Sequence, residues 1–149
     1  MNYQVKEIKC LKIDFLLELA NEAKDEGHDF VQKTIDDWNS GTNDFSKESE
    51  LLFGVFYKTD CIGIGGLNID PYTTDRKTGR IRHLYVSNIH RKKGIGKLIL
   101  NKLIESSKGS FDKLRLYTEN SLAISFYENY GFKKSSANKE SHYIEVKKV

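Results

Sequence analysis

The sequence has little proline, little cysteine and no long hydrophobic run. Its single proline, Pro71, falls in a polar stretch, and no linker, repeat or low-complexity segment interrupts the chain. The two cysteines, Cys10 and Cys61, are far apart and lack metal-binding spacing, which favours a reduced cytosolic protein over a disulfide-stabilised one. No run approaches the length of a membrane span, and the first residues lack the apolar core of a signal peptide. These absences predict a cytoplasmic protein without a membrane partner.

The sequence also lacks a large excess of either positive or negative charge. The chain carries 24 basic and 21 acidic residues, which gives a formal net charge of +3. Such a small excess does not require nucleic acid as a partner. The basic run at 91–93 is short and lacks a surrounding basic face, so a local anionic ligand is sufficient to explain it.

The remaining composition is typical of one globular domain. Hydrophobic residues make up 38% and aromatic residues 11% of the 149 residues, despite 30% charged residues. A chain of this length buries about two-thirds of the surface that its unfolded form exposes. We therefore expect residues 1–149 to form a single domain.

Hydrophobic spacing predicts alternating strands and helices. A short strand begins at Tyr3, a helix follows from Ile13, and a second helix follows Asp29, which can cap it, and ends at Ser40-Gly41. Further along, the pattern predicts a hairpin over 51–67, a strand over 81–86, a helix over 94–108, a strand over 114–118, a helix capped by Asn120 or Ser121, and a terminal hairpin over 132–146. This order predicts an α/β layer structure with a mixed sheet.

The loop between the predicted strand and helix has the chemistry of an anion site. Gly94 and Gly96 remove side chains where the first N–H groups of a helix lack partners, and Arg91, Lys92 and Lys93 add positive charge. A phosphate would suit this position. Gly-x-Gly alone is weak evidence for a phosphate site, because the same residues can simply begin a solvated surface helix. The sequence also lacks the motif of a nucleoside-triphosphate loop and the third glycine of a dinucleotide-binding motif.

Two separated motifs together resemble one known family. Leu84-Tyr85-Val86 followed by Arg91-x-x-Gly94-x-Gly96, and then Asn120-x-x-Ala123-x-x-Phe126-Tyr127-x-x-x-Gly131-Phe132, are similar to the GNAT N-acetyltransferase superfamily. The resemblance covers residues 80–132. It implies a mixed, mostly antiparallel central sheet of about seven strands, flanked by about four helices. It also implies a splayed strand pair that forms an acyl-CoA cleft.

The resemblance implies acetyl-CoA as the cofactor, with CoA as the product. Backbone groups of the strand would pair with the pantetheine arm, and the loop would wrap the pyrophosphate. The residues expected to bind the cofactor are Leu84, Tyr85, Val86, Arg91, Lys92, Lys93, Gly94, Ile95, Gly96, Asn120, Ala123 and Tyr127.

The catalytic groups are expected from the needs of an acyl thioester. The resemblance implies that the Val86 N–H donates to the oxyanion and that Tyr127, at the position of the family's tyrosine beside the thiol, is the general acid for the departing thiolate; the alternative for Tyr127 is a packed aromatic of an amphipathic helix. Many relatives have a glutamate where this chain has Arg80, which leaves the base open. His83 is a candidate, since it titrates near neutrality and is expected to share a strand face with Ile81 and Tyr85, although a structural histidine is the more common case. The acceptor side has four further candidates that the sequence does not rank, Glu22, Glu26, Asp70 and Tyr72.

These features predict an N-acetyltransferase that moves an acetyl group directly from acetyl-CoA to a primary amine in a ternary complex. Cys10 and Cys61 lie outside both motifs, which disfavours a covalent intermediate on cysteine. The acceptor is a small-molecule or peptide amine, and the terminal strands leave a homodimer open. The alternative is a non-catalytic acyl-CoA-binding sensor or regulatory module.

Overall fold

The structure, a computed structural model, describes residues 2–10 and 12–147. It contains a seven-stranded sheet with the strand order β1-β2-β3-β4-β5-β7-β6. The strands are β1 (Tyr3–Glu7), β2 (Leu51–Tyr57), β3 (Asp60–Ile69), β4 (Thr78–Val86), β5 (Lys113–Leu116), β6 (Lys133–Lys134) and β7 (His142–Glu145). The helices are η1 (Asp14–Leu16), α1 (Leu17–Asp25), α2 (Phe30–Ser40), η2 (Asn88–His90), α3 (Ile95–Ser107) and α4 (Ser121–Tyr130). The sheet is mostly antiparallel, and β4 and β5 form its parallel pair, so the predicted fold class is confirmed.

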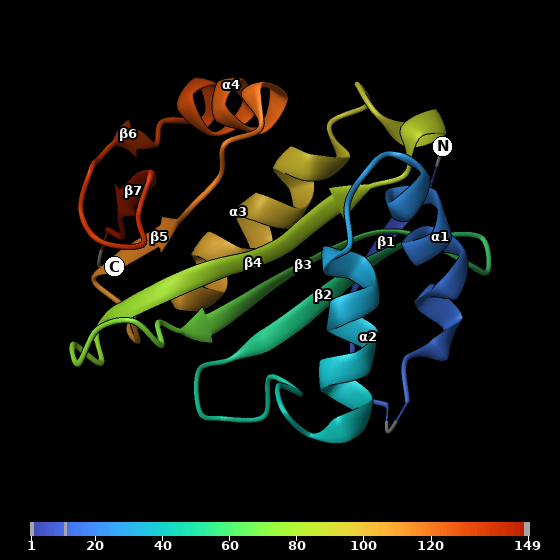
Figure 1. The fold of residues 1–149 in the computed structure, drawn as a ribbon, viewed down its shortest axis with the longest axis horizontal. Coiled ribbons are helices and arrows are strands. Elements are labelled where there is room, and N and C mark those ends of the chain that lie inside the picture. The colour runs from blue at the N-terminus through green and yellow to red at the C-terminus, as the bar shows by residue number, and fades with distance from the viewer. Residues whose placement is uncertain (1, 11, 148–149) are drawn as a thin grey trace.

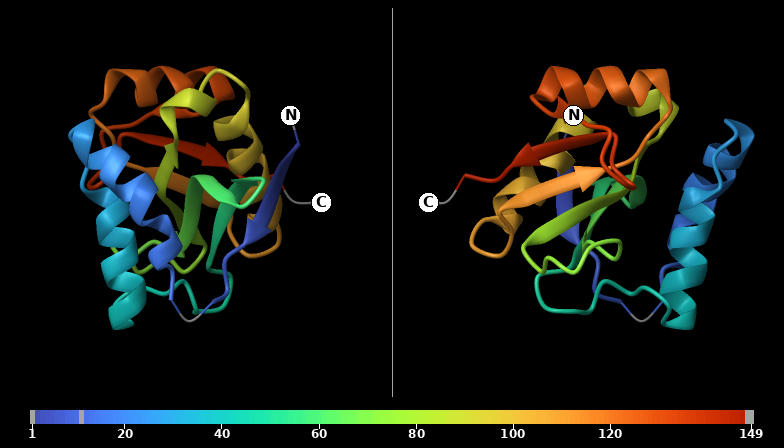
Figure 2. Two further views of the ribbon diagram at one scale, coloured as in Figure 1. Left: turned by 90° about the vertical axis from the view of Figure 1, so that its right-hand side faces the viewer. Right: turned by 60° about the vertical axis from the view of Figure 1, so that its left-hand side comes forward.

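The helices form two layers around the sheet. Figures 1 and 2 show α1 and α2 side by side on one face, with α3 on the other face. The core under α1 and α2 includes Leu52 and Ile64 from the sheet. The opposite core contains Ile99 and Leu103 of α3 and also Tyr127 of α4.

The glycines of β3 allow α3 to lie close to the sheet. A Cβ atom at Gly65 would stand 2.5 Å from Cγ2 of Ile99, which is closer than any real Cβ contact. The apolar stripe of α3 repeats at Ile95, Ile99 and Leu103, a spacing that keeps one helical face on the sheet. Glycine in this strand therefore permits the close packing of helix and sheet.

Several element ends differ from the sequence prediction. Asp29 precedes α2, but its side chain makes no capping hydrogen bond. The strand predicted over 114–118 ends at Leu116, because its pairing with β7 ends there. Asn120 does cap α4, since its Oδ1 atom accepts hydrogen bonds from the N–H groups of Leu122 and Ala123. Within the described ranges, every helix is too short or too polar to cross a bilayer.

Candidate active site

The central sheet opens between β4 and β5. The two strands pair only over Thr78–Arg80 of β4, so the remainder of β4 has no partner on that side (Figure 1). The opening leads into a cleft of about 1450 Å³ that is bordered by β4, the starts of α3 and α4, and α2. A pocket for one drug-sized ligand typically measures about 300–1,000 Å³. The cleft therefore has room for a long cofactor and a second substrate.

A bulge in β4 forms the wall of the cleft opposite α4. The register against β3 shifts by one residue between the Ile64–Tyr85 and Gly66–Arg82 pairs, and His83 has φ +60°. This left-handed conformation is uncommon for a residue other than glycine. It alters the alternation of side chains along the strand.

The bulge corrects one prediction about His83. Ile81 packs in the core with α3, whereas Tyr85 packs in the core with α1 and α2, so the two do not share a face. The His83 ring lies 6.1 Å from that of Phe30, on the same side as Tyr85. An uninterrupted strand would have placed all three side chains on one face.

His83 is a neutral imidazole at neutral pH. Burial lowers its pKa to about 4, and the positive charge of Arg82 acts in the same direction. The ring can accept a proton. It is, however, a weak base for a free alkyl ammonium, which titrates near pH 10.

Val86 directs its backbone into the opening. The N–H of the next residue, Ser87, donates to the Ile62 carbonyl of β3 over 2.8 Å. Because alternate residues of an antiparallel ladder face the same neighbour, the N–H of Val86 faces the cleft, while that of Tyr85 faces β3. Of these two predicted cofactor-binding residues, only Val86 has its backbone groups on the cleft side.

The start of α3 is an open group of backbone donors. Gly94 has φ +80°, and a Cβ atom there would meet nothing within 4 Å. Among the described residues, the N–H groups of 92–97 have no hydrogen-bond acceptor. Gly96 faces Phe126, whose ring would stand 3.2 Å from an added Cβ. The geometry fits a phosphate group, because the donors are free and no side chain fills the turn.

Arg91 binds Glu26, the residue that follows α1, instead of pointing toward the start of α3. Its Nη1 atom donates to Glu26 Oε2 over 2.9 Å, its Nη2 atom donates to Glu26 Oε1, and its Nε atom donates to the Val86 carbonyl. The Tyr85 hydroxyl donates to the same Glu26 carboxylate. The hydrogen bond from Arg91, with the one from Tyr85, holds the pKa of Glu26 below its usual value.

The lysines of the loop do not all lie in the cleft. Lys92 borders it, whereas Lys93 does not. Lys97, one turn into α3, also borders it, although the sequence analysis did not single it out. Lys97 lies three positions after Gly94, a spacing that puts both on one side of the helix start and could have identified it from the sequence.

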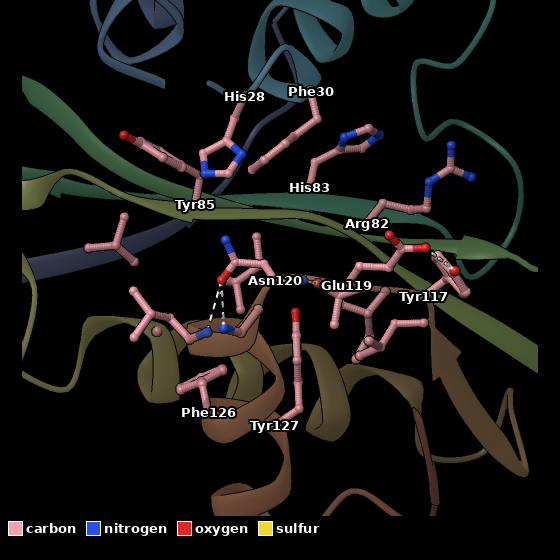
Figure 3. A pocket seen from close by; sticks show the side chains of 18 of the residues that line it. His28, Phe30, Arg82, His83, Tyr85, Tyr117, Glu119, Asn120, Phe126 and Tyr127 are labelled. Carbon is pink, nitrogen blue, oxygen red and sulfur yellow. Dashed lines mark hydrogen bonds between the residues drawn. The ribbon is translucent and has the colours of Figure 1, made fainter. Parts of the chain in front are cut away.

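The α4 wall carries a hydroxyl and a carboxamide. Tyr127 is 6% exposed, and its hydroxyl points into the cleft toward β4 (Figure 3). It has no hydrogen-bond partner among the residues that the structure describes, and burial raises its pKa. The Oδ1 atom of Asn120 caps α4, which leaves the NH2 group of its carboxamide available to donate to a ligand. The small Ala123 also lines the cleft.

Arg80 occupies the end of the parallel pair and is neutralised by a buried carboxylate. Asp70 accepts from Nη1 of Arg80 over 3.1 Å and from Nη2 of Arg115 over 2.7 Å. The Asp70 side chain is 0% exposed. This cluster joins β4 to β5 just before they part. Asp70 is therefore engaged away from the cleft.

The structure brings most of the predicted residues together. Of the four unranked acceptor-side candidates, Glu26 and Tyr72 border the cleft, whereas Glu22 and Asp70 do not. The cleft residues that the sequence analysis did not propose for the site include His28, Phe30, Arg82, Lys97, Tyr117, Glu119 and Lys139. They come from elements far apart in the chain, so only the fold places them beside β4. Cys10 and Cys61 are free thiols outside the cleft, and burial raises the pKa of Cys61 to about 12.

The same architecture occurs in solved structures. An acetyltransferase homologue from Exiguobacterium sp. 255-15 has 26% identity and a TM-score of 0.85, with 97% of this chain and 94% of that chain covered. A GNAT-family acetyltransferase from Staphylococcus aureus Mu50 has 18% identity and a TM-score of 0.80, with 98% and 100% covered. The PaiA N-acetyltransferase from Thermoplasma acidophilum, solved in complex with coenzyme A, has 22% identity and a TM-score of 0.75, with 99% of each chain covered.

The fold is that of an α/β protein whose sheet parts beside a helix start with free N–H groups. The family model for the acetyltransferase (GNAT) family matches residues 13–132. The chain belongs to this family, as the two sequence motifs predicted.

Proposed function

We propose that this protein transfers an acetyl group from acetyl-CoA to a primary amine. The observation that carries the proposal is the opening between β4 and β5, which ends at the free N–H groups of 92–97. A diphosphate would bind these donors, with Lys92 and Lys97 nearby, and the pantetheine arm would lie along β4. Residues 1–149 would act as a single domain, because the sheet includes residues from Tyr3 to Glu145.

In this proposal, acetyl-CoA supplies the activated thioester. The nitrogen lone pair of the amine forms the new N–C bond, the C–S bond breaks, and the sulfur leaves with both electrons. The Val86 N–H donates to the acetyl oxygen as its negative charge grows. The Tyr127 hydroxyl gives its proton to the sulfur and is later reprotonated by water.

The amine proton would go to His83 only after the N–C bond has formed. With a pKa of about 4, His83 is too weak a base for a free ammonium. The nitrogen becomes more acidic once it is bonded to the carbonyl carbon, and a weak base then suffices. The amine would therefore enter in its neutral form. No carboxylate base is required at Arg80, whose charge Asp70 neutralises.

Arg91 positions the loop in this scheme. Its contacts with Glu26 and the Val86 carbonyl connect α1 to the end of β4. Lys93, which does not border the cleft, contributes only long-range positive charge.

Two measurements test the proposal. Calorimetry should detect CoA binding, and thiol release from acetyl-CoA should depend on an added amine. Absence of CoA binding would refute both this function and the alternative of an acyl-CoA sensor. CoA binding without amine-dependent thiol release, across a panel of anionic, neutral and cationic amines, would favour the sensor.

A further inference from the structure

The cleft has two ends with different charged groups. The phosphate-accepting loop follows Val86, whereas Arg82 lies four residues earlier on β4. Because of the bulge at His83, the β3 partners of Arg82 and Val86 (Gly66 and Gly63) are only three residues apart, so the separation along the strand is about 10 Å. His83, the proposed proton acceptor, lies between them. Arg82 is therefore on the acceptor side of the proposed reaction, well away from the phosphates.

The acceptor end has cations without partners. Arg82 is half-buried, and neither it nor Lys139 makes a hydrogen bond or ion pair among the described residues. The Lys139 ammonium lies 5.4 Å from the centre of the Tyr72 ring, and the Arg80 guanidinium lies 4.7 Å from it. Burial lowers the pKa of His83, and the charge of Arg82 is the next largest cause; for Arg80, burial and the charge of Arg115 lower the pKa more than Arg82 does.

Three carboxylates lie around this end; two are paired with cations, and the third accepts a hydrogen bond from a neutral hydroxyl. Asp37 on α2 pairs with Lys33 at 3.3 Å, and Asp70 is bound by Arg80 and Arg115. The exposed Glu119 accepts a hydrogen bond from the Tyr117 hydroxyl. Figure 3 shows Arg82, Tyr117 and Glu119 at the same end of the cleft. No ion pair joins Arg82 to any carboxylate that the structure describes.

We propose that the acceptor is an amine that also carries a carboxylate, with the carboxylate bound by Arg82 and the amino group beside His83. This inference rests on the proposed transferase function. The planar guanidinium can donate two parallel N–H bonds to a carboxylate, and Lys139 adds a second positive charge. A polyamine would instead place its second cation against two like charges, which disfavours binding.

Matched amine pairs test this preference. The probes are glycine, β-alanine, γ-aminobutyrate and ε-aminocaproate, each compared with its own carboxamide, together with spermidine. The members of a pair have the same spacer and differ in the negative charge. For at least one spacer, we expect kcat/KM for the carboxylate to exceed that for the carboxamide by about tenfold or more, which corresponds to about 1.4 kcal/mol. Spermidine should be a poorer acceptor than that carboxylate.

Substitutions locate the source of the preference. In Arg82→Gln, the carboxylate-to-carboxamide ratio of kcat/KM should fall about tenfold, mainly through KM for the carboxylate, because the two-pronged contact is lost. Lys139→Gln should lower the ratio less, since a lysine contributes a single point charge. The matched control is Arg76→Gln, which removes the same charge from an exposed arginine outside the cleft and should leave the ratio unchanged.

The outcomes separate this inference from the function on which it rests. If every carboxamide is used as well as its carboxylate, or if spermidine is preferred, the transferase function stands and the carboxylate site is refuted. An unchanged ratio in Arg82→Gln, with CoA binding retained by calorimetry, would refute the role of Arg82. Failure of all amines would overturn both proposals together.

Discussion

Tyr127 is a single hydroxyl whose surroundings suit it to donate a proton. Its ring packs against those of Phe126 and Phe132, each 5.2 Å away between ring centres, while its oxygen points into the cleft. Burial raises its pKa, so the hydroxyl stays protonated at neutral and mildly alkaline pH. A hydroxyl that is held in place and remains protonated is suited to general-acid catalysis.

The first prediction concerns this hydroxyl. Tyr127→Phe should lower kcat by about 10²-fold or more, because general acids usually contribute 10²–10⁴-fold, while CoA affinity changes little. Steady-state kinetics and calorimetry measure the two quantities. Tyr130→Phe is the control, since that hydroxyl donates to Asn101 outside the cleft. A loss of less than about threefold in Tyr127→Phe would contradict the assignment.

The second prediction concerns Glu26 and pH. Its pKa is lower in the folded protein than in the unfolded chain, because Arg91 and Tyr85 donate to its carboxylate. A depressed carboxyl pKa stabilises the fold above the unfolded value of about 4.3, and this stability is lost as the pH falls through the folded pKa. Glu26→Gln should therefore lose about 0.5–1 kcal/mol at pH 7 and progressively less under acid.

Urea unfolding across this pH range measures the effect. Glu105→Gln, at an exposed position on α3, is the matched control and should show no such pH-dependent difference. A Glu26→Gln loss that stays constant down to pH 2 would mean that the ionised carboxylate is not responsible.

At the scale of elements, Gly94 in the turn into α3 has two roles that substitutions can separate: it adopts a positive φ, and it leaves the free N–H groups accessible. Gly94 adopts φ +80°, and Gly109, which follows α3, adopts φ +87°. An added Cβ meets nothing within 4 Å at either position. An L-residue pays roughly 1–2 kcal/mol in this conformation wherever it occurs. Only Gly94 borders the cleft.

The third prediction compares these glycines. Gly94→Ala and Gly109→Ala should each lose about 1–2 kcal/mol of unfolding free energy, because the backbone strain is the same. Only Gly94→Ala should also weaken CoA binding, by about tenfold or more, because its methyl group occupies the approach to the free N–H groups. Calorimetry measures the CoA affinity of each variant, once circular dichroism has shown that the variant is folded. Equal CoA affinity in the two variants would contradict the loop assignment.

At the scale of the whole molecule, the sheet consists of two parts that share a short junction. β4 and β5 pair over three residues, and Asp70 binds Arg80 on one strand and Arg115 on the other. Because these charges are buried, removing Asp70 leaves Arg80 without a carboxylate and Arg115 with only its longer contact to Glu140. The cluster therefore holds together the base from which the cleft opens.

The fourth prediction tests this junction. Asp70→Asn should lower the free energy of unfolding by about 3–5 kcal/mol, because it leaves the buried Arg80 without a carboxylate and Arg115 with Glu140 alone. Denaturant unfolding measures the change. Asp60→Asn, at the exposed first residue of β3, should stay within about 0.5 kcal/mol of the native protein. A comparably small effect at Asp70 would show that the junction does not depend on this carboxylate.

The sequence by itself determined the features that depend on neighbouring residues. The order of strands and helices, the Asn120 cap and the open turn at Gly94 all follow from short-range spacing, and the structure contains each of them. Two motifs of this kind, read together, also identified the family.

Only the tertiary structure decided the features that join distant segments. The Arg91–Glu26 ion pair spans 65 residues, and the Asp70–Arg115 pair spans 45. The bulge that moves His83 away from the face of Ile81 depends on the register with β3. Local periodicity contains no information on which strands part or which charges meet, because those outcomes depend on how the layers pack. The partners of Arg91 and the unpaired state of Arg82 therefore emerged only from the fold.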